Sequence, residues 1–314
     1  MDSTTRTLIR VLQKGLGDPG STQENGDGDG RFTPSTLSGD EKSSGSAKPA
    51  KSKDLSPERI SAWTSESIDR TTPGLQDRLV EIDRSMPPTY AEATATAEAN
   101  KIVASPEALA LVAPLAEEIV AHSEEAEKVL TPLVASIAEA TNGTQEGLQN
   151  ALKTEASMER KLAMDVEFGG RTPEDAAGRI SDGVRYTIVY DAEDYAASVT
   201  AAMDALEASG LQPLKSAPEF APTVERPSVQ MLTTWHDPVT QANVEVQFHT
   251  PDMLMVKESA NHSYYEAERT LPKGDPMKAE LGAKMEEFSS KVPIPPGVES
   301  WKDDPRFDYD NREQ

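Results

Sequence analysis

The run VEVQFHTP at residues 244–251 constrains the fold of this chain more than any other stretch. Side chains alternate between the two faces of a strand, so the apolar residues of the run are expected together on one face. The other face is expected to carry a row of polar side chains: Glu245, Gln247 and His249. Thr250 and Pro251 then provide a capping hydroxyl and a proline for the first helical turn. The run therefore predicts a strand that leads directly into a helix.

This polar row leaves two interpretations open. A carboxylate presented just before a helix, here that of Glu245, suits a general base or a ligand of a metal ion. The alternative is a half-exposed strand whose polar side chains only face solvent. On this run alone, the solvated strand is the commoner meaning of such a pattern.

Composition limits the classes of partner. The 314 residues include 54 acidic and 31 basic side chains, and the formal net charge is -23. A field of this sign repels nucleic-acid backbones and anionic membranes, so we expect neither DNA nor a membrane as a partner. The chain has no cysteine, which excludes disulfides and thiolate metal sites. We recognise no signal peptide, and no apolar run approaches the roughly 20 residues of a membrane span.

Composition and periodicity divide the chain into four segments. Residues 1–55 are rich in Gly, Ser, Asp and Lys and are expected to form a disordered arm, which suits contact with a protein partner. Residues 56–142 are Ala-rich and predict an all-helical region. Residues 143–290 mix helical and strand patterns, and residues 291–314 form a Pro-rich, charged tail. The whole pattern predicts an α+β fold with a mixed β-sheet flanked by helices.

Start and stop signals locate the expected elements within these segments. In the helical region, Pro106 and Pro132 are each expected to begin a helix. Residues 143–290 are expected to contain, in order, a helix over 144–164, a strand over 182–190, a helix ending at Gly210, a Pro-rich irregular loop, strands over 228–235 and 244–249, and helices over 251–270 and 276–290.

The helix expected over 144–164 carries a basic face. At helical periodicity, four polar residues fall in one sector of its surface: Lys153, Ser157, Arg160 and Lys161. On an acidic protein such a cluster suits a polyphosphate, because ammonium and guanidinium groups donate hydrogen bonds to phosphate oxygens. The alternative, commoner for any single basic stripe, is a solvated basic face.

Four local motifs, taken in order, resemble the RelA/SpoT-type nucleotidyltransferase domain over residues 95–272. The motifs are LKTEASMERK at 152–161, DGVRYT at 182–187, EVQFHT at 245–250 and HSYYE at 262–266. Each motif alone is weak, and their order and spacing carry the resemblance. Within the family the chain looks most like the variants found in actinobacterial polymorphic toxins and in phage proteins.

The resemblance implies a Mg²⁺-dependent transfer of pyrophosphate from ATP to the 3′-hydroxyl of a purine nucleotide or of an RNA end. It also implies that Asp182 and Glu245 are the catalytic residues and the ligands of Mg²⁺. The residues implied for ATP binding are Lys153, Ser157, Arg160, Lys161, Arg185 and Gln247. The residues implied for acceptor binding are Arg226, His249, His262 and Tyr265.

The chain departs from the family pattern at two places. Ile180 occupies the position where the family usually has its metal-binding Asp, and Asp182 lies one strand period later, on the same face. The family's Tyr-x-Gly segment, whose Tyr stacks on the acceptor base, is replaced by Arg226, Pro227 and Ser228. These departures bear on the identity of the acceptor and on activity itself.

Two further hypotheses compete with the enzymatic one. The first is a catalytically inactive domain of the same fold, used as a structural or interaction module, for example in a phage particle. The second is a nucleotide-binding regulator without turnover. For single residues, simpler roles stay open: Arg185 in a structural ion pair, and His249 and His262 as partly buried histidines. The expected location is the cytoplasm of a bacterial cell, or the virion if the protein comes from a phage.

Overall fold

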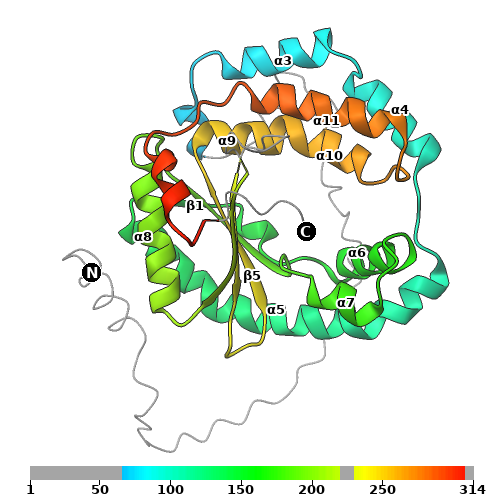
Figure 1. Ribbon diagram of the computed structural model, residues 1–314, viewed down its shortest axis with the longest axis horizontal. Coiled ribbons are helices and arrows are strands. Elements are labelled where there is room, and N and C mark those ends of the chain that lie inside the picture. Colours follow the sequence, from blue (N-terminus) through cyan, green and yellow to red (C-terminus); the bar gives the residue numbers. More distant parts are fainter. Residues whose placement is uncertain (1–65, 220–229, 308–314) are drawn as a thin grey trace, which may run out of the picture.

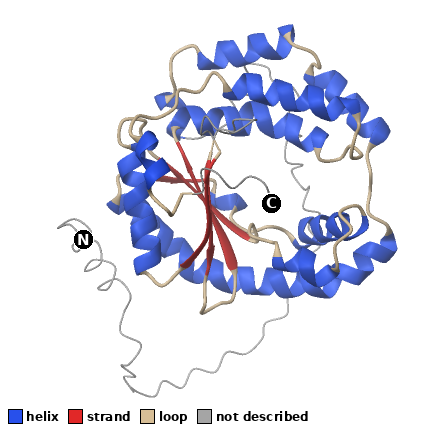
Figure 2. Ribbon diagram, in the orientation of Figure 1, coloured by secondary structure: helices blue, strands red, loops and turns tan. Residues whose placement is uncertain are grey.

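The computed structural model describes residues 66–219 and 230–307. The predicted fold class is confirmed: a five-stranded mixed β-sheet is flanked by helices, and a helix-rich region precedes it (Figures 1 and 2). The expected arm over 1–55 and the acceptor residue Arg226 lie outside the described residues. Among the described residues, no helix is both long and apolar enough to cross a bilayer.

The described elements follow one another along the chain with few long connections. In order they are η1 (Glu66–Arg70), α3 (Leu75–Ser85), α4 (Tyr90–Asn100), α5 (Pro106–Ala140), β1 (Thr144–Glu146), η2 (Leu148–Asn150), α6 (Glu155–Glu167), α7 (Pro173–Gly178), β2 (Val184–Val189), α8 (Tyr195–Ala208), β3 (Gln212–Pro218), β4 (Met231–His236), β5 (Asn243–His249), α9 (Pro251–Met255), the π-helix η3 (Val256–Asn261), α10 (His262–Glu268), α11 (Pro276–Ser289) and η4 (Val298–Asp303).

The sheet has the strand order β1-β2-β5-β4-β3. Strands β2 and β5 are parallel, and the other neighbours are antiparallel. In the parallel pair, Arg185 lies opposite Glu245 and Thr187 lies opposite Gln247. Residues in register point to the same face, so this pairing places Arg185 beside the polar row of β5.

The apolar face of the sheet packs against α5 and α8. Tyr186 of β2 forms a hydrogen bond with Thr131 of α5 (3.0 Å), and the hydroxyl of Tyr195 on α8 donates to the carbonyl of Phe248 (2.8 Å). In Figure 1, α8 lies on one side of the sheet and α6 with α7 on the other, while α3, α4, α9, α10 and α11 form a helical layer at one end. One hydrophobic core joins the apolar face to this helical layer.

Helix α5 is longer than predicted. The expectation of a separate helix beginning at Pro132 is wrong, because α5 runs over 35 residues with Pro114 and Pro132 inside it. The buried stripe continues across the second proline, with Leu130 and Val134 both in the core. Both prolines are on the exposed side of the helix. Burial of the opposite face therefore outweighs the cost of a proline within the helix.

The α-helix expected over 144–164 is also shorter than predicted, and residues 144–154 are not α-helical. The chain instead forms β1 and η2, and α6 begins only at Glu155, where the side chain of Thr154 caps it. Leu152 forms an antiparallel bridge with Val184 at the start of β2, and the backbone N–H of Lys153 donates to the carbonyl of Gly183 (3.0 Å). Pairing with the sheet and the Thr154 cap together shift the helix start.

Two segments expected to be irregular or peripheral pack against the sheet. The Pro-rich stretch predicted as a loop contains the edge strand β3, antiparallel to β4. Its prolines are tolerated because an edge strand leaves half of its N–H groups without a partner strand. Near the C-terminal end, Trp301 stacks on Phe307 (ring centroids 4.4 Å apart) and lies 6.0 Å from the Tyr195 ring.

Candidate functional site

The centre of the candidate site is a Lys–Asp–Lys cluster, formed by Lys153, Asp182 and Lys161. The Nζ of Lys153 lies 2.8 Å from one carboxylate oxygen of Asp182, and the Nζ of Lys161 lies 2.7 Å from the other. The Asp182 side chain is 17% exposed. Burial alone would raise the pKa of Asp182, but the two lysines outweigh it and lower this pKa to about 2. Asp182 is therefore charged and fully paired at neutral pH.

Three elements hold the cluster in place. Lys153 comes from the extended segment that pairs with β2, Lys161 comes from α6, and Asp182 lies just ahead of β2. Met158 and Leu162 of α6 are fully buried against α5 and α7, which fixes the face of α6 that carries Lys161.

A close approach of the chain to α5 fixes Asp182 itself. The next residue, Gly183, lies against Ser123 of α5, and a Cβ at this position would collide with the Ser123 hydroxyl. Only glycine lets the start of β2 come this close, so Gly183 determines where Asp182 sits.

The polar row of β5 is buried and hydrogen-bonded. Glu245 is 6% exposed, Gln247 is 3% exposed and His249 is fully buried. The Nε2 of Gln247 donates to Glu245 (2.5 Å), and its Oε1 lies 3.3 Å from the Nε2 of His249. The three residues share one face, as expected. The interpretation as a half-exposed, solvated strand is wrong, because β5 is the central strand of the sheet and all three polar side chains are buried.

Electrostatic neighbours connect Glu245 to the Lys–Asp–Lys cluster. Burial raises the pKa of Glu245, and the negative charge of Asp182 raises it further. Arg185, Gln247 and Lys257 act in the opposite direction without cancelling the rise. A carboxyl group with a raised pKa is a stronger base than an exposed one. The structure thus brings Asp182, Glu245 and Arg185 within electrostatic reach of one another.

The sequence did not indicate two charged residues of this site, Lys257 and Glu258. Both lie on the π-helix η3, and the Nζ of Lys257 is 2.6 Å from Glu258. Burial alone would raise the pKa of Glu258, but Lys257 lowers it below its usual value, with smaller contributions from His262 and Arg185. A π-turn rotates the following residues relative to an α-helix. Regular helical periodicity therefore gave no signal for their position.

The remaining predicted residues lie at the margin of the site or outside it. Ser157 is in the first turn of α6 and accepts a hydrogen bond from Thr154 (2.9 Å), and Arg160 is exposed on the same helix. Tyr265 of α10 is 51% exposed, with the guanidinium of Arg269 5.8 Å from the centre of its ring. Ile180, expected from the resemblance to stand where RelA/SpoT-type enzymes have a metal-binding Asp, is 4% exposed in a hydrophobic cluster with α6 and α7.

The carboxylates of Asp182 and Glu245 fit Mg²⁺ only if the two lysines release Asp182. Mg²⁺ commonly binds one or two protein carboxylates together with phosphate oxygens and water, and Asp182 and Glu245 provide two carboxylates. Among residues 66–219 and 230–307, no three His, Asp or Glu side chains gather as a metal-binding group. Both oxygens of Asp182 already carry an ammonium partner. Asp182 and Glu245 therefore suit Mg²⁺ when Lys153 and Lys161 have another anion to bind.

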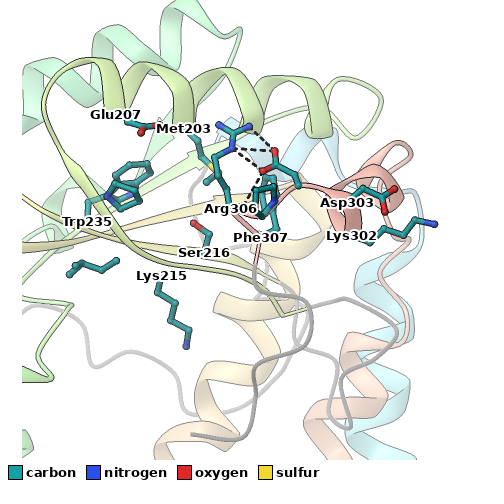
Figure 3. A pocket seen from close by; sticks show the side chains of 13 residues that line it. Met203, Glu207, Lys215, Ser216, Trp235, Lys302, Asp303, Arg306 and Phe307 are labelled. Atoms are coloured by element: carbon teal, nitrogen blue, oxygen red, sulfur yellow. Dashed lines mark hydrogen bonds and ion pairs between the residues drawn. The ribbon is translucent and has the colours of Figure 1, made fainter.

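A surface hollow lies elsewhere on the molecule. It has a volume of about 790 Å³ and lies between the edge strand β3, the end of α8 and the C-terminal segment (Figure 3). Among its lining residues, Arg306 pairs with Asp304 (2.8 Å) and also contacts Asp204, and the indole of Trp235 is almost fully buried. No residue predicted for the site lines this hollow. The predicted site residues therefore lie in and around the charged cluster and not in this hollow.

Comparisons with known proteins do not assign a family. A scan against protein-family models finds no match, and a search of curated proteins also finds none.

Proposed function

We propose that this chain transfers pyrophosphate from ATP to the 3′-hydroxyl of a purine nucleotide or of an RNA end. The observation that carries the proposal is the meeting of two lysines with Asp182, beside the buried Glu245 and Arg185. Two cations supported by a carboxylate suit the phosphates of ATP. A basic carboxylate next to them suits the attacking hydroxyl. The resemblance of the four motifs to RelA/SpoT-type enzymes supports the same assignment.

In the proposed reaction, the 3′-oxygen of the acceptor attacks the β-phosphorus of ATP. A bond forms between this oxygen and the β-phosphorus, and the bond from the β-phosphorus to the oxygen that bridges it to the α-phosphate breaks. AMP leaves with that oxygen, and the β- and γ-phosphates stay on the acceptor. The proton of the hydroxyl passes to Glu245, whose burial raises its pKa and so its basicity.

The other residues hold the phosphates rather than react. Lys153 and Lys161 neutralise charge that builds up on the transferred group, and Arg185 adds a third cation on the same face of the sheet. Gln247 orients Glu245 through the hydrogen bond between their side chains. Mg²⁺, when bound by Asp182 and Glu245, would supply further charge neutralisation at the phosphates.

The test is incubation of the protein with Mg²⁺, a panel of purine nucleotides and tRNA, and ATP labelled in the γ-phosphate. The proposal predicts a labelled product carrying two phosphates at its 3′ end, and AMP in equal amount. Glu245→Gln keeps the shape of the side chain and removes the base, so it should lower the rate at least about 100-fold.

Glu174→Gln serves as the matched control, because Glu174 is exposed on α7 and outside the cluster. This variant should keep the full rate. The absence of product with every acceptor, or an equal rate in the Glu245→Gln variant, would contradict the proposal.

One observation favours a second candidate, the catalytically inactive module. Asp182 is paired through both oxygens, and Glu245 is bonded to Gln247 in a buried row. A polar network this complete also suits a purely structural role. Isothermal titration with ATP separates the two candidates, because a structural module should bind no ATP with or without Mg²⁺.

A further inference from the structure

The charge balance of the Lys–Asp–Lys cluster opposes the binding of a cation by itself. Lys153 and Lys161 bring two positive charges to the single negative charge of Asp182, and each occupies one carboxylate oxygen. A divalent cation that approaches Asp182 meets a net positive cluster. It must also displace an ammonium group from a short, charge-assisted hydrogen bond.

A polyphosphate meets the opposite situation. Its negative charge is attracted to the net positive cluster, and its oxygens can accept from both ammonium groups. The side chains of Lys153 and Lys161 are 22% and 34% exposed, so both have access to an incoming ligand. An ammonium group has three N–H donors on a flexible stem. Each lysine can therefore turn from Asp182 to a phosphate without a change in the backbone.

We infer that Lys153 and Lys161 make divalent-cation binding at Asp182 conditional on a polyphosphate. Without the polyphosphate, the lysines hold the carboxylate and exclude the cation. With it, the lysines bind phosphate oxygens and release Asp182, which then faces Glu245 as a free carboxylate. The inference rests on the proposed function for the nature of the ligand. It adds an order of events: the polyphosphate binds first, and the cation binds afterwards.

The inference can be tested without turnover. Mn²⁺, whose free form is counted by electron paramagnetic resonance, is titrated into the protein in the absence of any phosphate compound. The Lys153→Met/Lys161→Met variant should bind Mn²⁺ at least about tenfold more tightly than the unaltered protein, since one charge-assisted hydrogen bond is worth roughly this factor. Adding Asp182→Asn to the double variant should remove the gain.

Arg160→Met is the matched control for net charge. Arg160 is an exposed cation on the same helix α6, outside the Lys–Asp–Lys cluster. Its replacement should change the Mn²⁺ affinity far less than the double variant does. Circular dichroism checks the fold of each variant, and the single variant Lys161→Met takes the place of the double variant if the latter is unfolded. Equal Mn²⁺ affinity in the variant and the unaltered protein would overturn the inference.

A second measurement uses only the unaltered protein. Inorganic triphosphate is titrated by calorimetry in excess EDTA, and the inference predicts saturable binding without any metal. Triphosphate binding that requires Mg²⁺ would overturn it. Neither experiment involves an acceptor or a product. A protein that makes no product can therefore still confirm this order of binding, and an active enzyme can still refute it.

Discussion

Lys284 of α11 shows what a single buried charge does in this fold. Its side chain is fully buried, and its Nζ donates to the carbonyls of Ile82 (3.0 Å), Asp83 (3.0 Å) and Met86 at the end of α3. The ammonium group also lies 5.4 Å from the centre of the Tyr264 ring. The last carbonyls of a helix have no partner within the helix. Lys284 supplies that partner and joins α3 to α11.

At this scale we predict that Lys284→Met destabilises the protein by about 3 kcal/mol, because it removes a buried donor shared by three carbonyls at the end of α3. Chemical denaturation followed by circular dichroism measures the change. Lys278→Met on the same helix is the control, since Lys278 is only half-buried, and it should have little effect. A loss of stability equal to that of the control would refute the role of Lys284 as a helix cap.

The pH dependence of this difference follows from the burial of Lys284. Burial lowers the pKa of its ammonium group from the ordinary 10.5, against the opposing effect of Asp83. Between the lowered pKa and the ordinary one, the unfolded chain binds more protons than the folded chain. The contribution of Lys284 to the free energy of unfolding therefore increases with pH between these two pKa values. The Lys284→Met variant has no such contribution. Denaturation curves at several pH values above neutral should show the gap between the two proteins widening.

At the scale of elements, α5 contains two internal prolines, Pro114 and Pro132, which destabilise a helix. The sequence pattern alone predicts a separate helix that begins at Pro132. A proline inside a helix removes one backbone hydrogen bond and strains the preceding turn. We predict that Pro114→Ala and Pro132→Ala each stabilise the protein by about 1 kcal/mol, because both positions are exposed and within regular helix. Thermal unfolding measures the shift. A lower melting temperature in both variants would mean that the curvature imposed by the prolines is needed for packing.

The sequence predicted the elements with a strong local pattern and failed where a distant partner decides. The strand β5 and the helix after it followed from alternation and from the Thr250 cap, which the structure also shows. The extended conformation around Lys153 depends on pairing with Gly183, and the strand β3 depends on β4. The π-turn that carries Lys257 has no periodic signature. Local sequence does not encode any of these three.

The same distinction applies to the candidate site. The sequence predicted which residues belong to the site, because four charged residues lie in the motifs that carry the resemblance: Lys153, Lys161, Asp182 and Glu245. The sequence did not predict that Lys153 and Lys161 form ion pairs with Asp182. Nor did it predict the burial of Glu245, which depends on how distant parts of the chain pack around β5.

At the scale of the whole molecule, we expect the two ends of the chain to differ in their contribution to stability. Removal of residues 1–55 should leave the melting temperature unchanged, because this composition cannot bury much apolar surface. Removal of residues 298–314 should cost roughly 5 kcal/mol, since Val298, Trp301 and Phe307 are all nearly buried. Calorimetry of both truncated proteins tests the contrast. Equal melting temperatures after the two truncations would refute it.

The parallel pairing of β2 with β5 has a consequence for how the protein matures. Asp182 and Glu245 become neighbours only across this pair, and α8, β3 and β4 lie between them in the chain. A growing polypeptide that has left the ribosome as far as α8 has both lysines and Asp182 but no second acid. Binding of a divalent cation between these two acids should therefore appear late in synthesis, and arrested chains of increasing length would reveal the step at which it appears.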